Sequence, residues 1–230
     1  MIERQMLLWQ ARHRAESEKP CVDAVSRFQF ITITRSDGTL GDEVAQELAT
    51  RLGWRVFDSE IVNYIAENSH VRESLVRQLD ERSQGLIADS IMRLLRMPEW
   101  KSFGSDEYHE ALIRTLAYLS TQGDAILVGR GANFALHGED HGLHIRTVAS
   151  QAVRVKRLGK AWHVAPEPVR RCMLAGDEER RHFVRHHFKQ DLDDLTYYDM
   201  VFNTDHMTVD DVVSSVLAVL FPVSSESLAS

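Results

Sequence analysis

Residues 28–58 read FQFITITRSDGTLGDEVAQELATRLGWRVFD, and this stretch decides the fold. The apolar, β-branched run at 28–34 predicts a strand that is buried on both faces of a parallel sheet. Apolar residues recur at helical spacing over 41–52, and Gly53 stands where a left-handed C-terminal cap is expected. A short strand at 54–57 follows. This order of strand, glycine-containing loop, helix and strand predicts the opening βαβ unit of a phosphate-binding fold.

The loop after the first strand lacks the lysine of the P-loop pattern GxxxxGK[ST]. In that pattern backbone N–H groups hold phosphate oxygens, the lysine reaches the terminal phosphates, and the Ser/Thr hydroxyl holds Mg²⁺. The positions after Thr39 and Leu40 here are Gly41, Asp42 and Glu43, so the lysine is missing. The loop therefore predicts a phosphate ligand and leaves open whether chemistry happens there. The alternative is an ordinary tight turn built on Asp37 and Gly38.

Composition narrows the class of protein. The 230 residues are 43% hydrophobic and 27% charged, which predicts one soluble globular domain that is expected to be cytoplasmic. No segment approaches the roughly 20 apolar residues that span a bilayer. The two cysteines lie far apart, without the spacing of a zinc site or a disulfide framework. The net charge is −7, yet eleven Lys and Arg fall between 146 and 189, which suits a small polyanion better than nucleic acid or a membrane.

The rest of the chain alternates helices and strands. We expect an N-terminal arm at 1–25 and one α/β domain at 26–225, with a helical insertion at 59–122. Further strands are predicted at 125–128, 143–148 and 200–203, and further helices at 151–158, 166–188 and 209–220. This alternation predicts a doubly wound parallel sheet, whose ligand site lies at the carboxyl ends of the strands.

Polar residues follow three of the predicted strands, so they should meet at one crevice. Arg130 stands between two glycines after the strand at 125–128, which gives its guanidinium access to a ligand and little packing of its own. We interpret Arg130 as functional. Asp58 follows the second strand, and a ligand role for it is balanced against simple capping of the next helix.

The basic segment adds a second group of candidates. Arg154 and Arg157 lie three residues apart on one predicted helix, and the next helix carries Asp177, Arg180, Arg181 and Arg185. The connection at 159–168, GKAWHVAPEP, is typical of a flexible segment that closes over a ligand. The alternative is a solvated helix with ion pairs. The pair His182 and His186 lacks the glutamate of the zinc hydrolase motif, so we predict no metal site there.

Four motifs together resemble the cytidylate kinase-like family, relatives of bacterial cytidylate kinase among the nucleoside monophosphate kinases. They are the loop and helix ITRSDGTLGDEVAQELATRLGWRVFDSEIV, the segment LVGRGANF, the run DEER followed by FVRHHF, and the C-terminal YDMVFNTDHMTVDDVV. They occur in the family's order, between 28 and 220. Relatives commonly read Ser-Arg-Glu-Tyr-Gly-Ser-Gly-Gly where this chain has Thr-Arg-Ser-Asp-Gly-Thr-Leu-Gly. True cytidylate kinases have Lys and Thr in place of Gly41 and Glu43, and Asp in place of Gly131.

The resemblance implies ATP-dependent phosphoryl transfer to a nucleoside monophosphate such as CMP, with Mg²⁺ bridging the donor phosphates. It implies a P-loop core with an acceptor lobe at 59–122 and a lid at 159–170. By position, the donor phosphates would be held by Ser36, Asp37, Gly38, Thr39, Leu40 and Gly41. The acceptor would be held by Asp58, Arg130, Asn133 and Asp177. The transferring group would be neutralised by Arg35, Arg154, Arg157, Arg180 and Arg185.

The resemblance to the family, together with the positions at which this sequence differs from the family's motifs, leaves two functions of different kinds open. In the first, the chain is a nucleotide or small-molecule kinase in which Arg35 or a lid arginine replaces the missing lysine. In the second, it is a non-catalytic nucleotide- or phosphate-binding sensor or interaction module on the same fold. The helical insertion also offers apolar surface for a homodimer.

Overall fold

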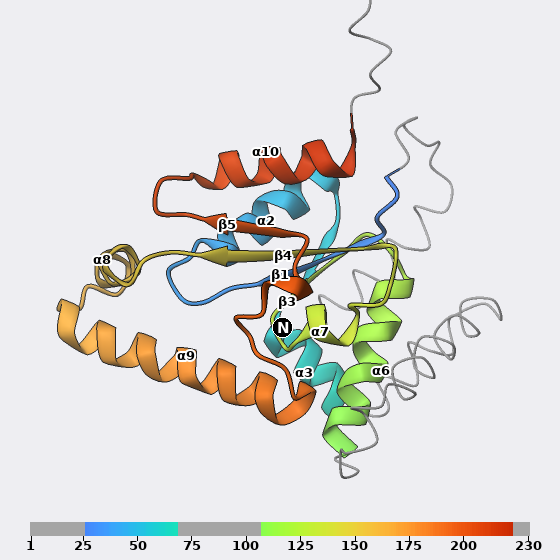
Figure 1. Ribbon diagram of the computed structural model, residues 1–230, viewed down its shortest axis with the longest axis horizontal. Coiled ribbons are helices and arrows are strands. Elements are labelled where there is room, and N and C mark those ends of the chain that lie inside the picture. The colour runs from blue at the N-terminus through green and yellow to red at the C-terminus, as the bar shows by residue number, and fades with distance from the viewer. Residues whose placement is uncertain (1–25, 69–106, 223–230) are drawn as a thin grey trace, which may run out of the picture.

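The computed structural model describes residues 26–68 and 107–222 (Figure 1). The predicted arm at 1–25 and the greater part of the predicted acceptor lobe, 69–106, lie outside the described residues. A homodimer built on that lobe therefore stays a prediction. Within the described ranges, no helix combines the length and the apolar character needed to cross a membrane.

Five parallel strands form one sheet in the order β2-β3-β1-β4-β5, as the alternation of elements predicted. Their bounds are β1 Phe30–Thr34, β2 Arg55–Phe57, β3 Ala125–Val128, β4 Gly142–Val148 and β5 Met200–Asn203. β1 is central and buried at every position. Ile33 of β1 is in register with Val128 and Ile145, so the carboxyl ends of β1, β3 and β4 lie at the same edge of the sheet. This edge carries the candidate site.

Helices cover both faces of the sheet (Figure 1). α2 (Gly41–Leu52) and α10 (Val209–Leu220) lie on one face, and α3 (Ser59–Glu67), α6 (Glu107–Thr121) and α7 (Ala132–Ala135) lie on the other. Successive β1 side chains alternate between the two cores: Phe30 packs with α3 and α6, whereas Ile31 and Ile33 pack with α2 and α10. This alternation explains why the strand is buried along its whole length. α3 and α6 therefore contribute to the main core, and the helical insertion at 59–122 with its role as an acceptor lobe stays a prediction.

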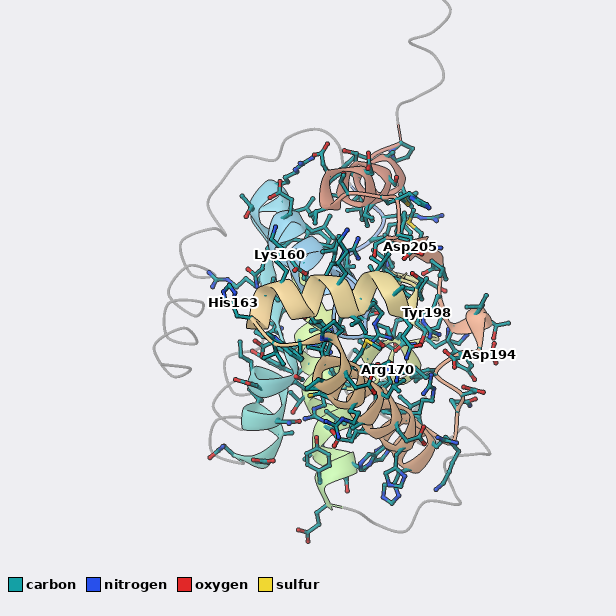
Figure 2. All side chains as sticks on the ribbon, turned by 90° about the vertical axis from the view of Figure 1, so that its left-hand side faces the viewer. Lys160, His163, Arg170, Asp194, Tyr198 and Asp205 are labelled. Carbon is teal, nitrogen blue, oxygen red and sulfur yellow. The ribbon has the colours of Figure 1, made fainter. Side chains whose placement is uncertain are left out.

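α8 (Gln151–Trp162) and α9 (Pro166–Phe188) form a helical hairpin beside the carboxyl edge of the sheet, and the 3₁₀ turn Leu195–Tyr197 leads into β5 (Figures 1 and 2). Leu158 of α8 packs on Val169 and Met173 of α9. Only three residues connect the two helices, and the first of them, His163, has a left-handed backbone conformation with φ 56°. The expected flexible connection at 159–168 is thus largely helical. Closure of 159–170 as a lid stays a prediction.

Candidate functional site

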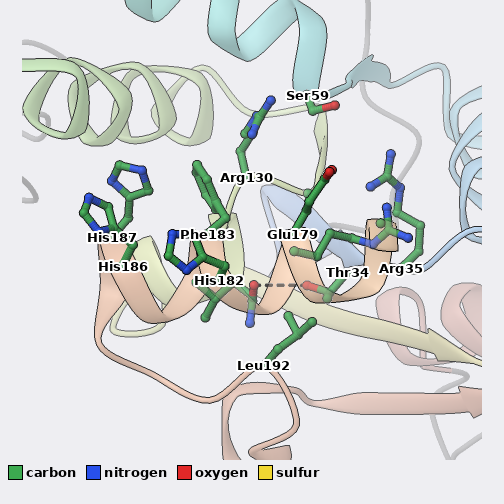
Figure 3. A pocket seen from close by; sticks show the side chains of 16 residues that line it. Thr34, Arg35, Ser59, Arg130, Glu179, His182, Phe183, His186, His187 and Leu192 are labelled. Carbon is green, nitrogen blue, oxygen red and sulfur yellow. Dashed lines mark hydrogen bonds between the residues drawn. The ribbon is translucent and has the colours of Figure 1, made fainter. Parts of the chain in front are cut away.

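A cavity of about 530 Å³ lies where the ends of β1 and β3 meet α9 (Figure 3). Its walls come from Thr34 and Arg35, from the glycine segment 129–131, from Ser59, and from the face of α9 between Gly176 and His187. This is the edge of the sheet at which the sequence placed the ligand. The cavity size is in the range of sites for small molecules.

Arg130 projects into this cavity (Figure 3) from a strained segment of backbone. Gly129, Arg130 and Gly131 have φ values of 77°, 52° and 67°, and for a residue other than glycine this conformation costs roughly 1 to 2 kcal/mol. A side chain at Gly131 has no room, because an added Cβ would lie 2.1 Å from Phe188 Cε2. The fold therefore holds an unfavourable conformation that aims one arginine at the cavity. An outlier of this kind is typical of a functional residue.

The Arg130 guanidinium has no acceptor within the described residues. Its carbon lies 5.0 Å from the centre of the Phe183 ring, which is a cation–π contact. Its Nε is buried, and across the described parts of the chain no hydrogen-bond partner is found for that atom. An anionic group in the cavity would supply the missing acceptor.

Arg35 fills the space in which the P-loop lysine would begin. A Cβ atom added at Gly41 would lie 2.4 Å from Arg35 Cβ and 2.7 Å from Thr147 Oγ1. A Cβ added at Gly129 would lie 3.3 Å from Arg35 Nη1. Both glycines therefore leave room for the Arg35 side chain, whose Nε pairs with Asp42 Oδ1 at 2.9 Å. The lysine is excluded by the local geometry, and a different cation lies in its place.

The loop at 35–40, which is predicted to hold donor phosphate, is held by hydrogen bonds between its own residues and leads into α2. Thr39 is buried, its hydroxyl donates to Ser36 O at 2.7 Å, and its oxygen lies 2.9 Å from Thr147 Oγ1. Gly38 and Leu40 have positive φ values of 78° and 61°. α2 begins without a side-chain cap, so the N–H groups of its first turn are available to phosphate oxygens.

A network of two arginines and two aspartates ties this loop to the hairpin. Arg154 donates from Nη1 and Nη2 to both Asp177 oxygens at 2.8 Å, and its Nε donates to Asp37 O at 2.7 Å. Arg180 donates to Asp37 Oδ2 at 2.7 Å and to Asp177 Oδ1 at 3.1 Å. Burial acts to raise the pKa of Asp177, but bonds and charge from Arg154 and Arg180 outweigh it and hold that pKa below its ordinary value. The four charges balance within the network.

The arginines of the basic segment have partners within the protein, and their expected role at the transferring phosphoryl group stays a prediction. Arg157 also serves the loop, because it donates to Gly38 O at 3.0 Å and to Thr204 O at 2.5 Å. Arg154, Arg157 and Arg180 thus donate hydrogen bonds to protein atoms and hold the loop after β1 in position. Arg185 is exposed, pairs with Glu178 at 2.7 Å, and is not among the residues that line the cavity.

Two residues expected at the acceptor have other partners in the structure. Asp58 caps α3, where its Oδ1 accepts hydrogen bonds from the Glu60 and Ile61 N–H groups at 3.0 and 2.9 Å. This is the capping alternative, and a ligand role for Asp58 stays a prediction. Asn133 is only 1% exposed, and its Oδ1 accepts from Thr34 Oγ1 at 3.0 Å (Figure 3). Its Nδ2, at the cavity wall, has no partner in the described ranges.

Sequence reasoning missed much of the wall that α9 contributes. The missed lining residues are Glu179, His182, Phe183, His186 and His187. The spacing of the sequence could have shown this wall. Residues 176, 180, 183 and 187 recur at intervals of three and four, and 179 lies three after 176 and four before 183, so all five share one helical face. The rings of His182 and His186 stack with their centres 6.0 Å apart. In the described parts of the chain, no group of three or more metal-binding side chains occurs.

Comparison with solved structures supports the fold. An uncharacterized protein from Eubacterium ventriosum ATCC 27560 is similar, with 16% identity and a TM-score of 0.64 over 83% of this chain and 97% of that chain. The shikimate kinase from Acinetobacter baumannii, solved in complex with shikimate, has 12% identity and a TM-score of 0.43, over 85% of this chain and 94% of that one. No curated protein matches the sequence significantly.

The model of the cytidylate kinase-like family matches residues 30–206, which include all five strands and both helices of the hairpin. The match covers well over half of the chain, and its core is the parallel sheet that carries the cavity. The protein therefore belongs to the cytidylate kinase-like family.

Proposed function

We propose that this protein transfers a phosphoryl group from ATP to a small phosphate-bearing acceptor, of which a nucleoside monophosphate such as CMP is the first choice. The observation that carries the proposal is Arg130. Its backbone is strained, its guanidinium faces the cavity, and no acceptor for it is present among the described residues. A phosphate oxygen pair suits the fork of an arginine.

The donor is expected at the loop that follows β1. The uncapped start of α2 offers backbone N–H groups, and Arg35 supplies a cation over Gly41. Arg35 also lines the cavity that contains Arg130, so two guanidinium groups from neighbouring strand ends border one space. Phosphoryl transfer depends chiefly on such positioning and on neutralising charge on the transferring group.

The residues present are compatible with Mg²⁺ at the donor phosphates. Asp42 and Glu43 are exposed carboxylates in the first turn of α2, and carboxylate oxygens are ligands that Mg²⁺ accepts. Bound Mg²⁺ would neutralise donor phosphate charge. Arg154 and Arg157 have the separate task of holding the loop carbonyls of Asp37 and Gly38 in place, and Arg180 holds the Asp37 carboxylate.

The test is coupled ADP release across a panel of nucleoside and sugar monophosphates, with calorimetry of each acceptor. Arg130→Gln should weaken acceptor binding by about 10- to 100-fold, because it removes a charge-assisted pair of hydrogen bonds. Arg185→Gln is the matched control, since Arg185 is an exposed arginine outside the cavity lining. Acceptor affinity that is the same in Arg130→Gln and in the wild type would exclude this acceptor site.

A second function has its own supporting observation. Gly41 stands where true cytidylate kinases have a lysine. Arg35 is paired with Asp42, and Arg154 and Arg180 are neutralised by aspartates. Such internal pairing suits a non-catalytic module that binds a nucleotide or phosphate and reports its presence. Binding of ATP and monophosphates without ADP release on any acceptor would favour this function over the kinase.

A further inference from the structure

Two adjacent glutamates on α9 have different surroundings. Glu178 pairs with Arg185 at 2.7 Å and lies 3.7 Å from Arg181, so its charge is balanced at the surface. Glu179 lines the cavity, and Figure 3 shows its carboxylate on the same side of α9 as Arg130 and Phe183. No hydrogen bond or ion pair links the Glu179 carboxylate to another described residue.

Among the described residues that line the cavity, one arginine and one glutamate have no partner of opposite charge. Arg35 is paired with Asp42, and Arg180 is paired with Asp37 and Asp177. The remaining charges at the walls are Arg130 and Glu179, with His182, His186 and His187 farther along α9. No ion pair joins Arg130 to Glu179 among the contacts of the described residues.

A ligand with one anionic group can bind Arg130 through that group, so that only its uncharged part lies near Glu179. A ligand with a second anionic group would bring it towards the Glu179 carboxylate, where like charges repel.

We infer that Glu179 is a specificity-determining residue that restricts the acceptor to small molecules with a single anionic group. This inference rests on the proposed function, because it takes the cavity to be the acceptor site. It narrows the acceptor to phosphate monoesters with an otherwise neutral body and excludes bisphosphates and phosphorylated acids. Specificity by a repulsive group of this kind is independent of how tightly the correct ligand binds.

The test compares two probes by calorimetry, CMP and cytidine 3′,5′-bisphosphate, on three proteins. Glu179→Gln removes the charge and keeps the size, and Glu178→Gln makes the same change on the neighbouring residue that is outside the cavity. We expect the wild type and Glu178→Gln to prefer CMP by about tenfold or more. Glu179→Gln should reduce this preference by about tenfold, mainly through tighter binding of the bisphosphate.

A CMP preference in Glu179→Gln that equals the wild-type preference would overturn the inference. The proposed function would survive that result if CMP binding still depends on Arg130. If neither probe shows binding that depends on Arg130, the acceptor site itself is wrong and the inference falls with it. Thermal unfolding of both glutamine variants controls for folding, and both should match the wild type because both glutamates are exposed.

Discussion

The Asp37 carboxylate accepts a hydrogen bond of 2.7 Å from Arg180, which lies 143 residues later in the chain. Asp37 belongs to the loop that should hold donor phosphate, where a free carboxylate would repel the ligand. The bond to Arg180 directs this charge towards α9 and neutralises it there. Arg180 in turn shares Asp177 with Arg154, so the loop acid is part of the network that fixes the loop.

The first prediction concerns Asp37→Asn. In the structure the Asp37 carboxylate has Arg180 as its partner. Neutralising Asp37 should release part of the Arg180 charge, so inorganic phosphate and ATP should bind several-fold more tightly. Asp210→Asn is the control, because it breaks a surface pair with Arg51, between α10 and α2. Weaker phosphate binding in Asp37→Asn than in the control would show that the carboxylate helps the ligand.

The second prediction concerns Arg35, the cation nearest the missing lysine. Arg35→Ala should abolish ADP release and leave the fold intact, since the side chain is part of no apolar core. Arg35→Lys should retain partial activity, because it keeps a charge but loses the fork that also reaches Asp42. Circular dichroism checks folding, and single-turnover ADP formation checks chemistry. Full activity in Arg35→Ala would remove Arg35 from the mechanism.

Much of the fold followed from the sequence because it depends on local periodicity. The apolar run of β1, the helical spacing of α2 and the glycine cap at Gly53 are all properties of neighbouring residues, and the structure confirms them. The position of Arg130 followed in the same way, since a strand end between two glycines exposes whatever residue it carries.

The pairing of charges did not follow from the sequence. Arg154 could bind a phosphate or pair with Asp177. The outcome depends on how the α8–α9 hairpin packs against a loop more than 100 residues earlier in the chain. The choice between Glu178 and Glu179 depends on the rotation of α9 about its axis, which places only one of them at the cavity. Both are tertiary properties, so the arginines expected at phosphate were found at carboxylates and carbonyls.

The third prediction concerns stability and pH. Burial lowers the pKa of His144 to about 4, although nearby Asp199 acts to raise it, and the ring Nδ1 lies 2.8 Å from Thr32 Oγ1. Histidine in the unfolded chain has its ordinary pKa near 6.5, so below that pH the unfolded state binds the extra proton first. Stability should therefore fall as pH decreases from about 6.5 to about 4, by on the order of 3 kcal/mol from this group.

Urea unfolding at a series of pH values between 7 and 4 measures this effect. His144→Gln should have a lower stability at pH 7 but a shallower dependence on pH than the wild type. Exposed His141 lies three residues away, and His141→Gln serves as the control that should keep the wild-type slope. Equal slopes in His144→Gln and the wild type would assign the acid sensitivity to other groups.

The last prediction asks why the lysine of the P-loop pattern is missing. An added Cβ at Gly41 would lie 2.4 Å from Arg35 Cβ and 2.7 Å from Thr147 Oγ1, so any side chain at 41 must displace its neighbours. Gly41→Lys should therefore destabilise the protein by roughly 1 to 3 kcal/mol, the range for overpacking a filled site, and should not improve turnover.

Arg35→Ala, combined with Gly41→Lys, should not relieve the strain, because alanine keeps the Cβ that makes the closest contact. Arg35→Gly removes that atom, so the double variant with Gly41→Lys should recover part of the lost stability. Urea midpoints of the three single and two double variants measure this recovery. A Gly41→Lys protein as stable as the wild type would show that the loop has room for the lysine.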